Sequence, residues 1–174
     1  MSLIINNPSY SQKLKQHPQI QAWLKSAEAE LNVAFSLRWT HACRTQRRLY
    51  DEASCSRDLG YFWNGVDRAL YGDDWKQRKL KRLTVLENTD GTNWHIHGLC
   101  SADRYSVGMM KLKLTELWLR HVKIDGSNRH THKHLVWIEQ SRGDYGNYIL
   151  KHVGNGTQHC GSVGVIDVLN TYLG

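Results

Sequence analysis

Residues 93–99 read Asn93-Trp94-His95-Ile96-His97-Gly98-Leu99, a strand-like run in which two histidines flank one bulky apolar residue. Alternate side chains of a β-strand share one face, so His95 and His97 point the same way, about 7 Å apart along the strand. Two imidazoles on one face can converge on a single cation, while Ile96 turns into the opposite layer. The run therefore predicts a β-strand with a metal-binding face.

A second motif lies downstream, at Tyr145-Gly146-Asn147-Tyr148-Ile149-Leu150-Lys151. Residues three apart on a helix are neighbours on one face, so Tyr148 lies beside Lys151 and Tyr145 beside Tyr148. A phenol next to an ammonium group suits nucleophilic attack on a phosphodiester, because the cation stabilises phenolate or phosphate charge. Taken alone, the spacing also fits an amphipathic helix with two half-buried tyrosines.

Together the two motifs resemble the HUH endonuclease superfamily, and within it the rolling-circle replication initiators, or Rep proteins. In that superfamily two histidines flank a hydrophobic residue, here Ile96, and the Rep nicking motif is Tyr-x-x-Lys, here Tyr148 to Lys151. Residues 34–40 are also similar to the family's first strand motif. The resemblance implies one HUH endonuclease (Rep nicking) domain over residues 1–174.

The activity that this resemblance implies is site-specific nicking of single-stranded DNA at a replication origin, which initiates rolling-circle replication. Glu87, His95 and His97 would hold the cofactor, one divalent ion, Mn²⁺ or Mg²⁺. Tyr148 would attack the phosphate, keep the 5′-phosphate and release a 3′-hydroxyl that can prime a polymerase or later rejoin the strand. Lys151 would stabilise the charge.

The place of Glu87 depends on strand register. Leu83 to Glu87 read as a strand, and the turn-forming residues 88–93 predict a hairpin that leads into the histidine strand. Glu87 shares the histidine face only if it lies opposite His95 and not Trp94. The resemblance favours the pairing with His95.

Tyr145 is a candidate second nucleophile, since it shares a helical face with Tyr148. Lys151 is three residues from Tyr148 but six from Tyr145. Gly146 and Asn147 also weaken the start of the helix around Tyr145. These features favour Tyr148 as the nucleophile.

Positive charge favours a phosphate-rich partner: the 174-residue chain carries a net charge of +7. The basic residues cluster after the first predicted strand and before the second. The predicted DNA contacts are Arg38, Arg44, Arg47, Arg48, Lys79, Lys81 and Arg82. Three tryptophans near them are candidates for stacking on unpaired bases, or else belong to the core: Trp39, Trp75 and Trp94.

Hydrophobic periodicity predicts helices at 19–31, within 45–71, at 106–121 and at 143–153. Strands are predicted at 33–40, 80–87, 93–101, 133–140 and 163–168. Apart from the added ends, this order is β-α-β-β-α-β, which predicts an α+β, ferredoxin-like (RRM-like) antiparallel sheet of about five strands flanked by helices. The same sheet is the basis of the HUH nuclease fold.

A rival histidine cluster alternates along residues 130–134, with His121 and His159 elsewhere in the chain. His130, His132 and His134 fit a zinc site, but the intervening Thr131 and Lys133 favour a basic loop.

Two histidines and a glutamate are also the ligand set of non-haem Fe(II) oxygenases. The predicted helices do not fit a jelly roll, however, and that activity leaves Tyr148 and Lys151 without a role. The remaining alternatives are an HUH transposase or relaxase-like nickase of a mobile element, and a non-catalytic module that binds single-stranded DNA.

The predicted partner is single-stranded DNA, at an origin hairpin or another single-stranded site, bound by a monomer or homodimer. The sequence lacks the G-x-x-x-x-G-K-[ST] motif, so a helicase, like the polymerase, would be supplied by other proteins. It also has no apolar run long enough to span a membrane and no CxxC pair among four cysteines. These features predict a cytoplasmic protein with free thiols, acting in the host cell's cytoplasm if a virus or plasmid encodes it.

Overall fold

The computed structural model describes residues 22, 26, 29–89, 93–123, 134–143, 145–150, 163–167 and 169–173. The strands are β1 (Val33–Arg38), β2 (Arg82–Thr89), β3 (Asn93–Cys100), β4 (Val136–Gln140) and β5 (Val163–Ile166). The helices are α3 (His41–Arg47), α4 (Glu52–Tyr71), α5 (Val107–His121) and α7 (Tyr145–Leu150), with a 3-10 turn η1 (Gly72–Lys76) after α4.

Most predicted elements are present, with shifted ends. The helical stretch expected within 45–71 is two helices, because Arg48 adopts a left-handed conformation (φ 55°) that ends α3. The strand expected at 133–140 begins at Val136, and the last strand ends at Ile166. Most of the helix expected at 19–31 lies outside the described residues.

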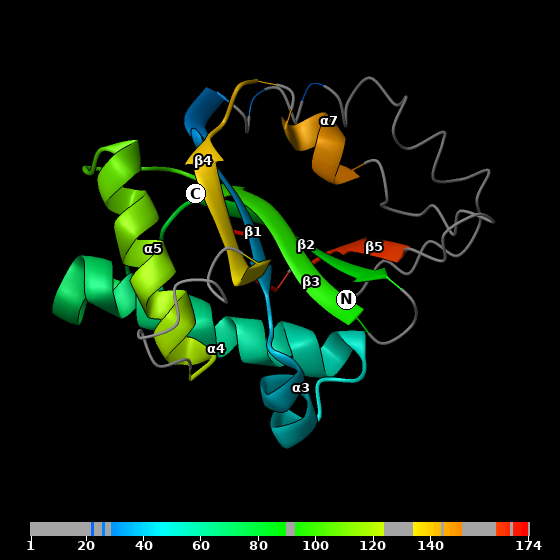
Figure 1. Cartoon of the computed structure of the whole chain (residues 1–174). Helices are drawn as coiled ribbons and strands as arrows, with labels where there is room; N and C mark the ends of the chain where they lie inside the picture. Colours follow the sequence, from blue (N-terminus) through cyan, green and yellow to red (C-terminus); the bar gives the residue numbers. More distant parts are fainter. Residues whose placement is uncertain are drawn as a thin grey trace.

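The five strands form one sheet in the order β4-β1-β3-β2-β5, and every neighbouring pair is antiparallel. Helices α4 and α5 cover one face, and α7 lies over the other face (Figure 1). The chain is therefore an α+β protein whose antiparallel sheet is flanked by helices, as the sequence predicted.

Period-two alternation assigns each strand residue to a face. On the side of α4 and α5, Phe35, Leu37 and Ile96 join a large core that includes Trp63 and Trp118, all at most 1% exposed. The alternate residues of the same strands face α7. This division leaves His95 and His97 on the face that α4 and α5 do not cover.

Gly98 allows the core side of the sheet to pack closely. A Cβ at this position would lie 2.2 Å from Cζ of Phe35 and 2.4 Å from the carbonyl oxygen of Leu83. The ring of Phe35 therefore occupies the space that any side chain at residue 98 would need.

Three cysteines, Cys43, Cys55 and Cys100, are buried free thiols. Burial raises the pKa of Cys55 and of Cys100 to about 12, and it also raises the pKa of Cys43. Within the described part of the chain, no helix combines the length and apolar character that a membrane crossing requires.

Candidate metal centre and adjoining groove

The β2–β3 hairpin brings a carboxylate and two imidazoles together. Glu87 pairs with His95 across the hairpin, and Val85 pairs with His97. Glu87 therefore lies on the histidine face, which confirms the register that the metal site requires.

The three side chains converge on one point. The Nε2 atoms of His95 and His97 lie 3.5 Å and 3.1 Å from the same oxygen, Oε2 of Glu87. One ligand atom from each residue lies within 4.8 Å of the other two. Ligands at about 2.1 Å from a shared divalent ion are roughly 3.0–3.5 Å from one another, so the two separations between the carboxylate oxygen and the imidazole nitrogens fit such an ion.

The hydrogen bonding of His95 also fits a metal ligand. Its Nδ1 lies 3.2 Å from the backbone carbonyl of Asn93, a contact that orients Nε2 toward Glu87 when Nδ1 carries the proton. Nδ1 of His97 is buried and has no hydrogen-bond partner among the described residues. A metal-binding histidine commonly donates the N–H of its second ring nitrogen to a neighbouring acceptor. Among the described residues, His95 has such an acceptor and His97 does not.

Charge in the cluster favours the ligand forms of these groups. Burial acts to raise the pKa of Glu87, but hydrogen bonds and charge from His95 and His97 outweigh it and hold that pKa well below its usual range. Burial is the largest cause that lowers the pKa of His97, and the charges of His95 and Arg38 add to the lowering, so that the pKa falls although hydrogen bonding and charge from Glu87 act to raise it. An ionised carboxylate and a neutral imidazole are the forms that coordinate a cation.

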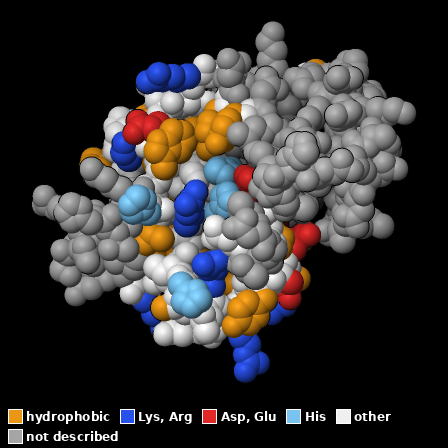
Figure 2. Space-filling view, turned by 45° about the vertical axis from the view of Figure 1, so that its right-hand side comes forward, with side chains coloured by type: hydrophobic (Ala, Val, Ile, Leu, Met, Phe, Trp, Pro, Cys, Tyr) orange, Lys and Arg blue, Asp and Glu red, His pale blue; other side chains and the backbone are white. Residues whose placement is uncertain are grey.

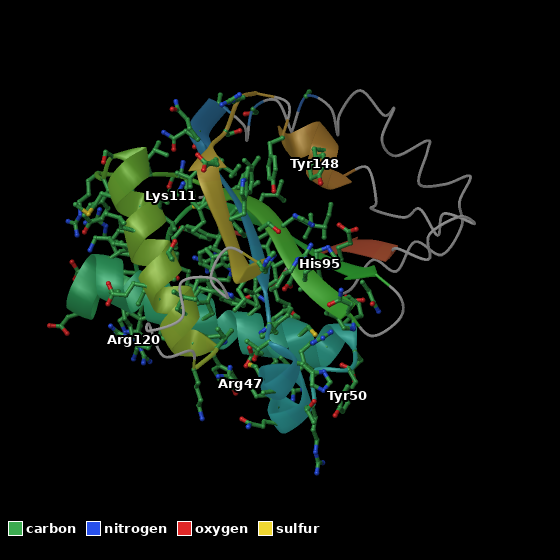
Figure 3. All side chains as sticks on the ribbon, viewed as in Figure 1. Arg47, Tyr50, His95, Lys111, Arg120 and Tyr148 are labelled. Carbon is green, nitrogen blue, oxygen red and sulfur yellow. The ribbon has the colours of Figure 1, made fainter. Side chains whose placement is uncertain are left out.

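Helix α7 places Tyr148 beside this cluster. Its ring centroid lies 6.2 Å from that of His97, and the residue is 48% exposed. Figure 3 shows His95 on β3 and Tyr148 on α7 at the same side of the sheet. The tyrosine that the sequence favoured as nucleophile is therefore both accessible and close to the candidate ligands.

Tyr145 has a different environment. Its hydroxyl donates a hydrogen bond of 3.1 Å to the carbonyl of Phe35, and burial raises its pKa above the usual value. Its ring stacks on Tyr148 at 5.5 Å and on Trp137 at 5.5 Å. These contacts make Tyr145 an anchor for α7. Lys151 lies outside the described residues.

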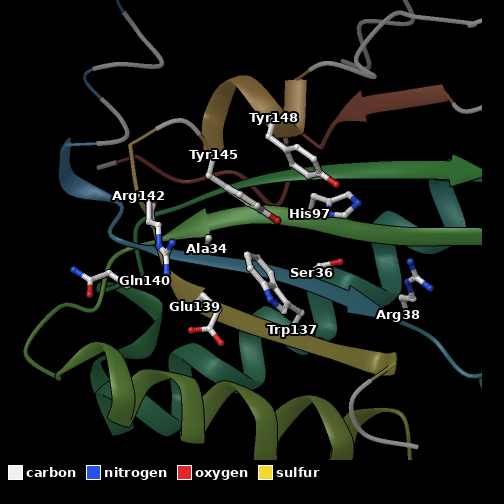
Figure 4. Close-up of a pocket in the computed structure, with 11 residues that line it drawn as sticks. Ala34, Ser36, Arg38, His97, Trp137, Glu139, Gln140, Arg142, Tyr145 and Tyr148 are labelled. Carbon is white, nitrogen blue, oxygen red and sulfur yellow. The ribbon is translucent and has the colours of Figure 1, made fainter.

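A groove of about 850 Å³ opens between β1, β4 and α7. Figure 4 shows His97 and Tyr148 at its upper side, Trp137 and Tyr145 pointing into it, and Arg38 and Arg142 toward opposite ends. Its lining residues are Ala34, Ser36, Arg38, His97, Trp137, Glu139, Gln140, Ser141, Arg142, Tyr145 and Tyr148. The groove thus runs directly into the candidate metal centre.

Two of the predicted DNA contacts lie near this centre. Arg38 is exposed and lines the groove, and Arg44 donates a hydrogen bond of 3.1 Å to Oδ1 of Asn93, the first residue of β3. The space-filling view shows Lys and Arg side chains next to histidines at the middle of this face (Figure 2). Arg48 and Lys79 are exposed but do not line the groove.

Arg82 does not belong to a DNA-binding surface, and the prediction that it contacts DNA is wrong. It is 4% exposed, pairs with Asp67 at 3.0 Å and lies over the ring of Trp63. A buried guanidinium held in this way cannot reach a phosphate.

Other basic residues of the predicted set are engaged with carboxylates. Arg47 pairs with Asp58 at 2.7 Å and also bonds the carbonyl of His121, and Lys81 pairs with Glu30 at 2.6 Å. Their positive charge is partly offset within the protein. They are therefore weaker candidates for DNA contacts than Arg38.

The tryptophan that lines the groove is not one of the three that the sequence indicated as candidates for base stacking. Trp39 and Trp94 are 3% and 8% exposed and belong to the core, while Trp75 lies under Arg68. Trp137, which sequence reasoning missed, is 43% exposed and lines the groove. The alternation of β4 contained this signal, since Val136 and Ile138 flank Trp137 and contact the opposite core.

Of the rival histidines, His121 and His134 lie within the described part of the chain. His121 contacts Oδ2 of Asp58 at 2.8 Å, and His134 is exposed. His130, His132 and His159 lie outside the described residues. Among the residues that are described, Glu87, His95 and His97 are the group arranged to hold a metal ion.

Comparison of the chain with known protein families, with curated proteins and with solved structures finds no match.

Proposed function

We propose that this protein is a metal-dependent nickase of single-stranded DNA that acts through a phosphotyrosine intermediate. The observation that carries the proposal is the position of Tyr148, an exposed phenol whose ring lies 6.2 Å from that of His97. A nucleophile beside a cluster of Glu87, His95 and His97 is an arrangement that suits metal-assisted phosphoryl transfer to a tyrosine.

The strand order supports an HUH nuclease fold. Strands β1 to β4 follow the order β-α-β-β-α-β along the chain and lie side by side as β4-β1-β3-β2. This order is compatible with a ferredoxin-like sheet, the sheet on which the HUH family is built. The paired histidines lie on a central strand, and the tyrosine helix follows the last of the four.

The chemistry follows from the residues around the groove. Glu87, His95 and His97 would hold one divalent ion, Mn²⁺ or Mg²⁺, which supplies Lewis-acid polarisation of the scissile phosphate. The hydroxyl oxygen of Tyr148 attacks phosphorus and loses its proton to solvent. The bond from phosphorus to the 3′-oxygen breaks, and that oxygen takes up a proton to leave as a 3′-hydroxyl. Lys151, three residues from Tyr148, would stabilise the developing charge.

The 5′-phosphotyrosine keeps the energy of the broken bond, so a later 3′-hydroxyl can reverse the step and rejoin the strand. A nickase of this kind initiates rolling-circle replication, and we favour that role because Tyr148 belongs to a Tyr-x-x-Lys motif and Glu87 precedes the histidines. An HUH transposase or relaxase-like nickase would use the same site. The helicase and polymerase would be other proteins, and we expect the protein to act in the cytoplasm of its host cell.

The test is incubation of the full chain with a pool of single-stranded DNA and Mn²⁺, followed by mass spectrometry for a nucleotidyl-tyrosine peptide. We expect the adduct on Tyr148, its loss in Tyr148→Phe, and most of it retained in Tyr145→Phe, since the Tyr145 hydroxyl is bonded to Phe35. An adduct mapped to Tyr145, or full activity in Tyr148→Phe, would overturn the assignment.

A second variant separates catalysis from binding. His95→Ala should abolish the adduct while affinity for single-stranded DNA, measured without metal, changes little, because that affinity comes mainly from basic residues. Binding without any adduct in the wild-type protein would instead favour a non-catalytic DNA-binding module.

A further inference from the structure

Trp137 stands out because it is a large apolar side chain exposed inside a cavity. It is 43% exposed, whereas its neighbour Ile138 on β4 is 2% exposed and packs in the core. A half-exposed indole contributes less to folding than a buried one, and its contact surface remains open to a ligand.

The indole is held in place from one side. Tyr145 stacks on it with an interplanar angle of 30° and a centroid distance of 5.5 Å. Tyr145 is fixed in turn by its hydrogen bond to the carbonyl of Phe35. Trp137 is therefore supported against β1 and α7 while the rest of its surface faces the groove (Figure 4). A preoriented aromatic surface of this kind suits a flat, unsaturated ligand.

Charge along the groove favours an anionic chain. Arg38 and Arg142 line it near opposite ends (Figure 4). Glu139, the acidic residue of the lining, is paired with Lys111 at 2.7 Å. A strand with phosphates on both sides of a base matches an aromatic surface between two guanidinium groups.

We propose that this groove binds one unpaired nucleobase, stacked on Trp137, with the flanking phosphates near Arg38 and Arg142. The identity of the strand as substrate rests on the proposed nickase function. His97 and Tyr148 line the same groove, so the stacked base belongs to a nucleotide close to the scissile phosphate. Trp137 is then a positioning residue that orients the strand for attack.

The test compares two fluorescent strands of roughly ten nucleotides, oligothymidylate and a fully abasic strand with the same phosphates. Affinities are measured by anisotropy with the full chain and with EDTA, so that cleavage does not occur. The wild-type protein should prefer the oligothymidylate. Trp137→Leu should reduce that preference about fivefold or more and leave affinity for the abasic strand nearly unchanged.

Two further variants keep the result interpretable. Trp137→Phe retains a ring and should lose less of the preference than Trp137→Leu. Trp75→Leu is the matched control, because Trp75 is half-buried under Arg68 and does not line the groove. Its preference should equal that of the wild type.

Equal affinity of the wild type for the two strands, or an equal loss for both strands in Trp137→Leu, would overturn the base site. The outcome is independent of the nickase. If no phosphotyrosine forms but Trp137→Leu still loses the preference, the groove binds bases and the nickase proposal is wrong. If Tyr148 is modified and Trp137→Leu keeps the full preference, the base site alone is wrong.

Discussion

Replacing Gly98 with alanine should destabilise the protein by about 3 kcal/mol or more, at the upper end of the usual cost of overpacking. The added methyl carbon would lie 2.2 Å from Cζ of Phe35 and 2.4 Å from the carbonyl oxygen of Leu83. Ordinary van der Waals contacts of a Cβ lie at 3.4–4 Å, so these neighbours must move by about 1 Å. The ring can turn aside, but the Leu83 oxygen belongs to the backbone of β2.

The same displacement reaches the candidate metal centre. Gly98 follows His97 on β3, and β2 carries Glu87, so forcing the two strands apart separates the carboxylate from the imidazoles. We therefore expect Mn²⁺ affinity to fall about tenfold, the lower end of the losses seen when a metal site's support is disturbed.

The assays are urea unfolding and calorimetric titration with Mn²⁺. For a chain of this size the expected loss lowers the melting temperature by about 6–12 °C. Gly65→Ala in α4 is the control, since nothing lies within 4 Å of its added Cβ, and it should stabilise the protein by about 0.5–1 kcal/mol. Adding Phe35→Leu to Gly98→Ala should rescue only part of the loss. A cost below about 1 kcal/mol for Gly98→Ala would refute the packing argument.

Three more predictions concern stability. Burial acts to raise the pKa of Asp58, but hydrogen bonds from His121, Arg47 and Trp39 outweigh it and lower that pKa below 3.8. The ionised carboxylate therefore stabilises the fold above that pH, and this stabilisation is lost as the pH falls through the folded-state pKa. The difference in unfolding free energy between wild type and Asp58→Asn, followed in urea from neutral pH downward, should be steady and then shrink under strongly acidic conditions; a difference that grows would contradict this. Arg82→Met should lower the free energy of unfolding by about 3–5 kcal/mol in chemical denaturation, because it leaves buried Asp67 without its ion pair. Adding Asp67→Leu should recover most of that loss, and a double variant as unstable as Arg82→Met would contradict this explanation. Mn²⁺ at about 100 times its dissociation constant should raise the unfolding free energy by about 2.7 kcal/mol in scanning fluorimetry, and an equal gain with EDTA or in Glu87→Ala would refute the site.

Local patterns were sufficient to predict the centre of this site. Side chains alternate strictly along a strand, so the shared face of His95 and His97 depends on no distant residue. Glu87 required one further assumption, the register of the hairpin, and the observed pairing with His95 confirms it.

The surroundings of the site depend on contacts far apart in sequence, which local patterns do not contain. Arg82 resembles an exposed basic residue until Asp67, fifteen positions earlier, is placed against it. Trp137 and Trp94 both lie in strands, but α4 and α5 cover one face of the sheet and leave the groove on the other. Which face a helix covers is decided by packing of the whole chain, and the groove follows from that choice.

The reactivity of the buried thiols measures how often the folded protein opens and exposes its core. At pH 8 a thiol whose pKa is raised to about 12 is almost entirely protonated, and only the thiolate reacts with alkylating or disulfide reagents. Cys55 lies in α4 and Cys100 ends β3, and both belong to the core between the helices and the sheet, so each becomes reactive when local or global opening exposes that core. The rates at which these cysteines are labelled therefore report how often the core is exposed to solvent. Air oxidation of the folded chain at these positions is slow for the same reason.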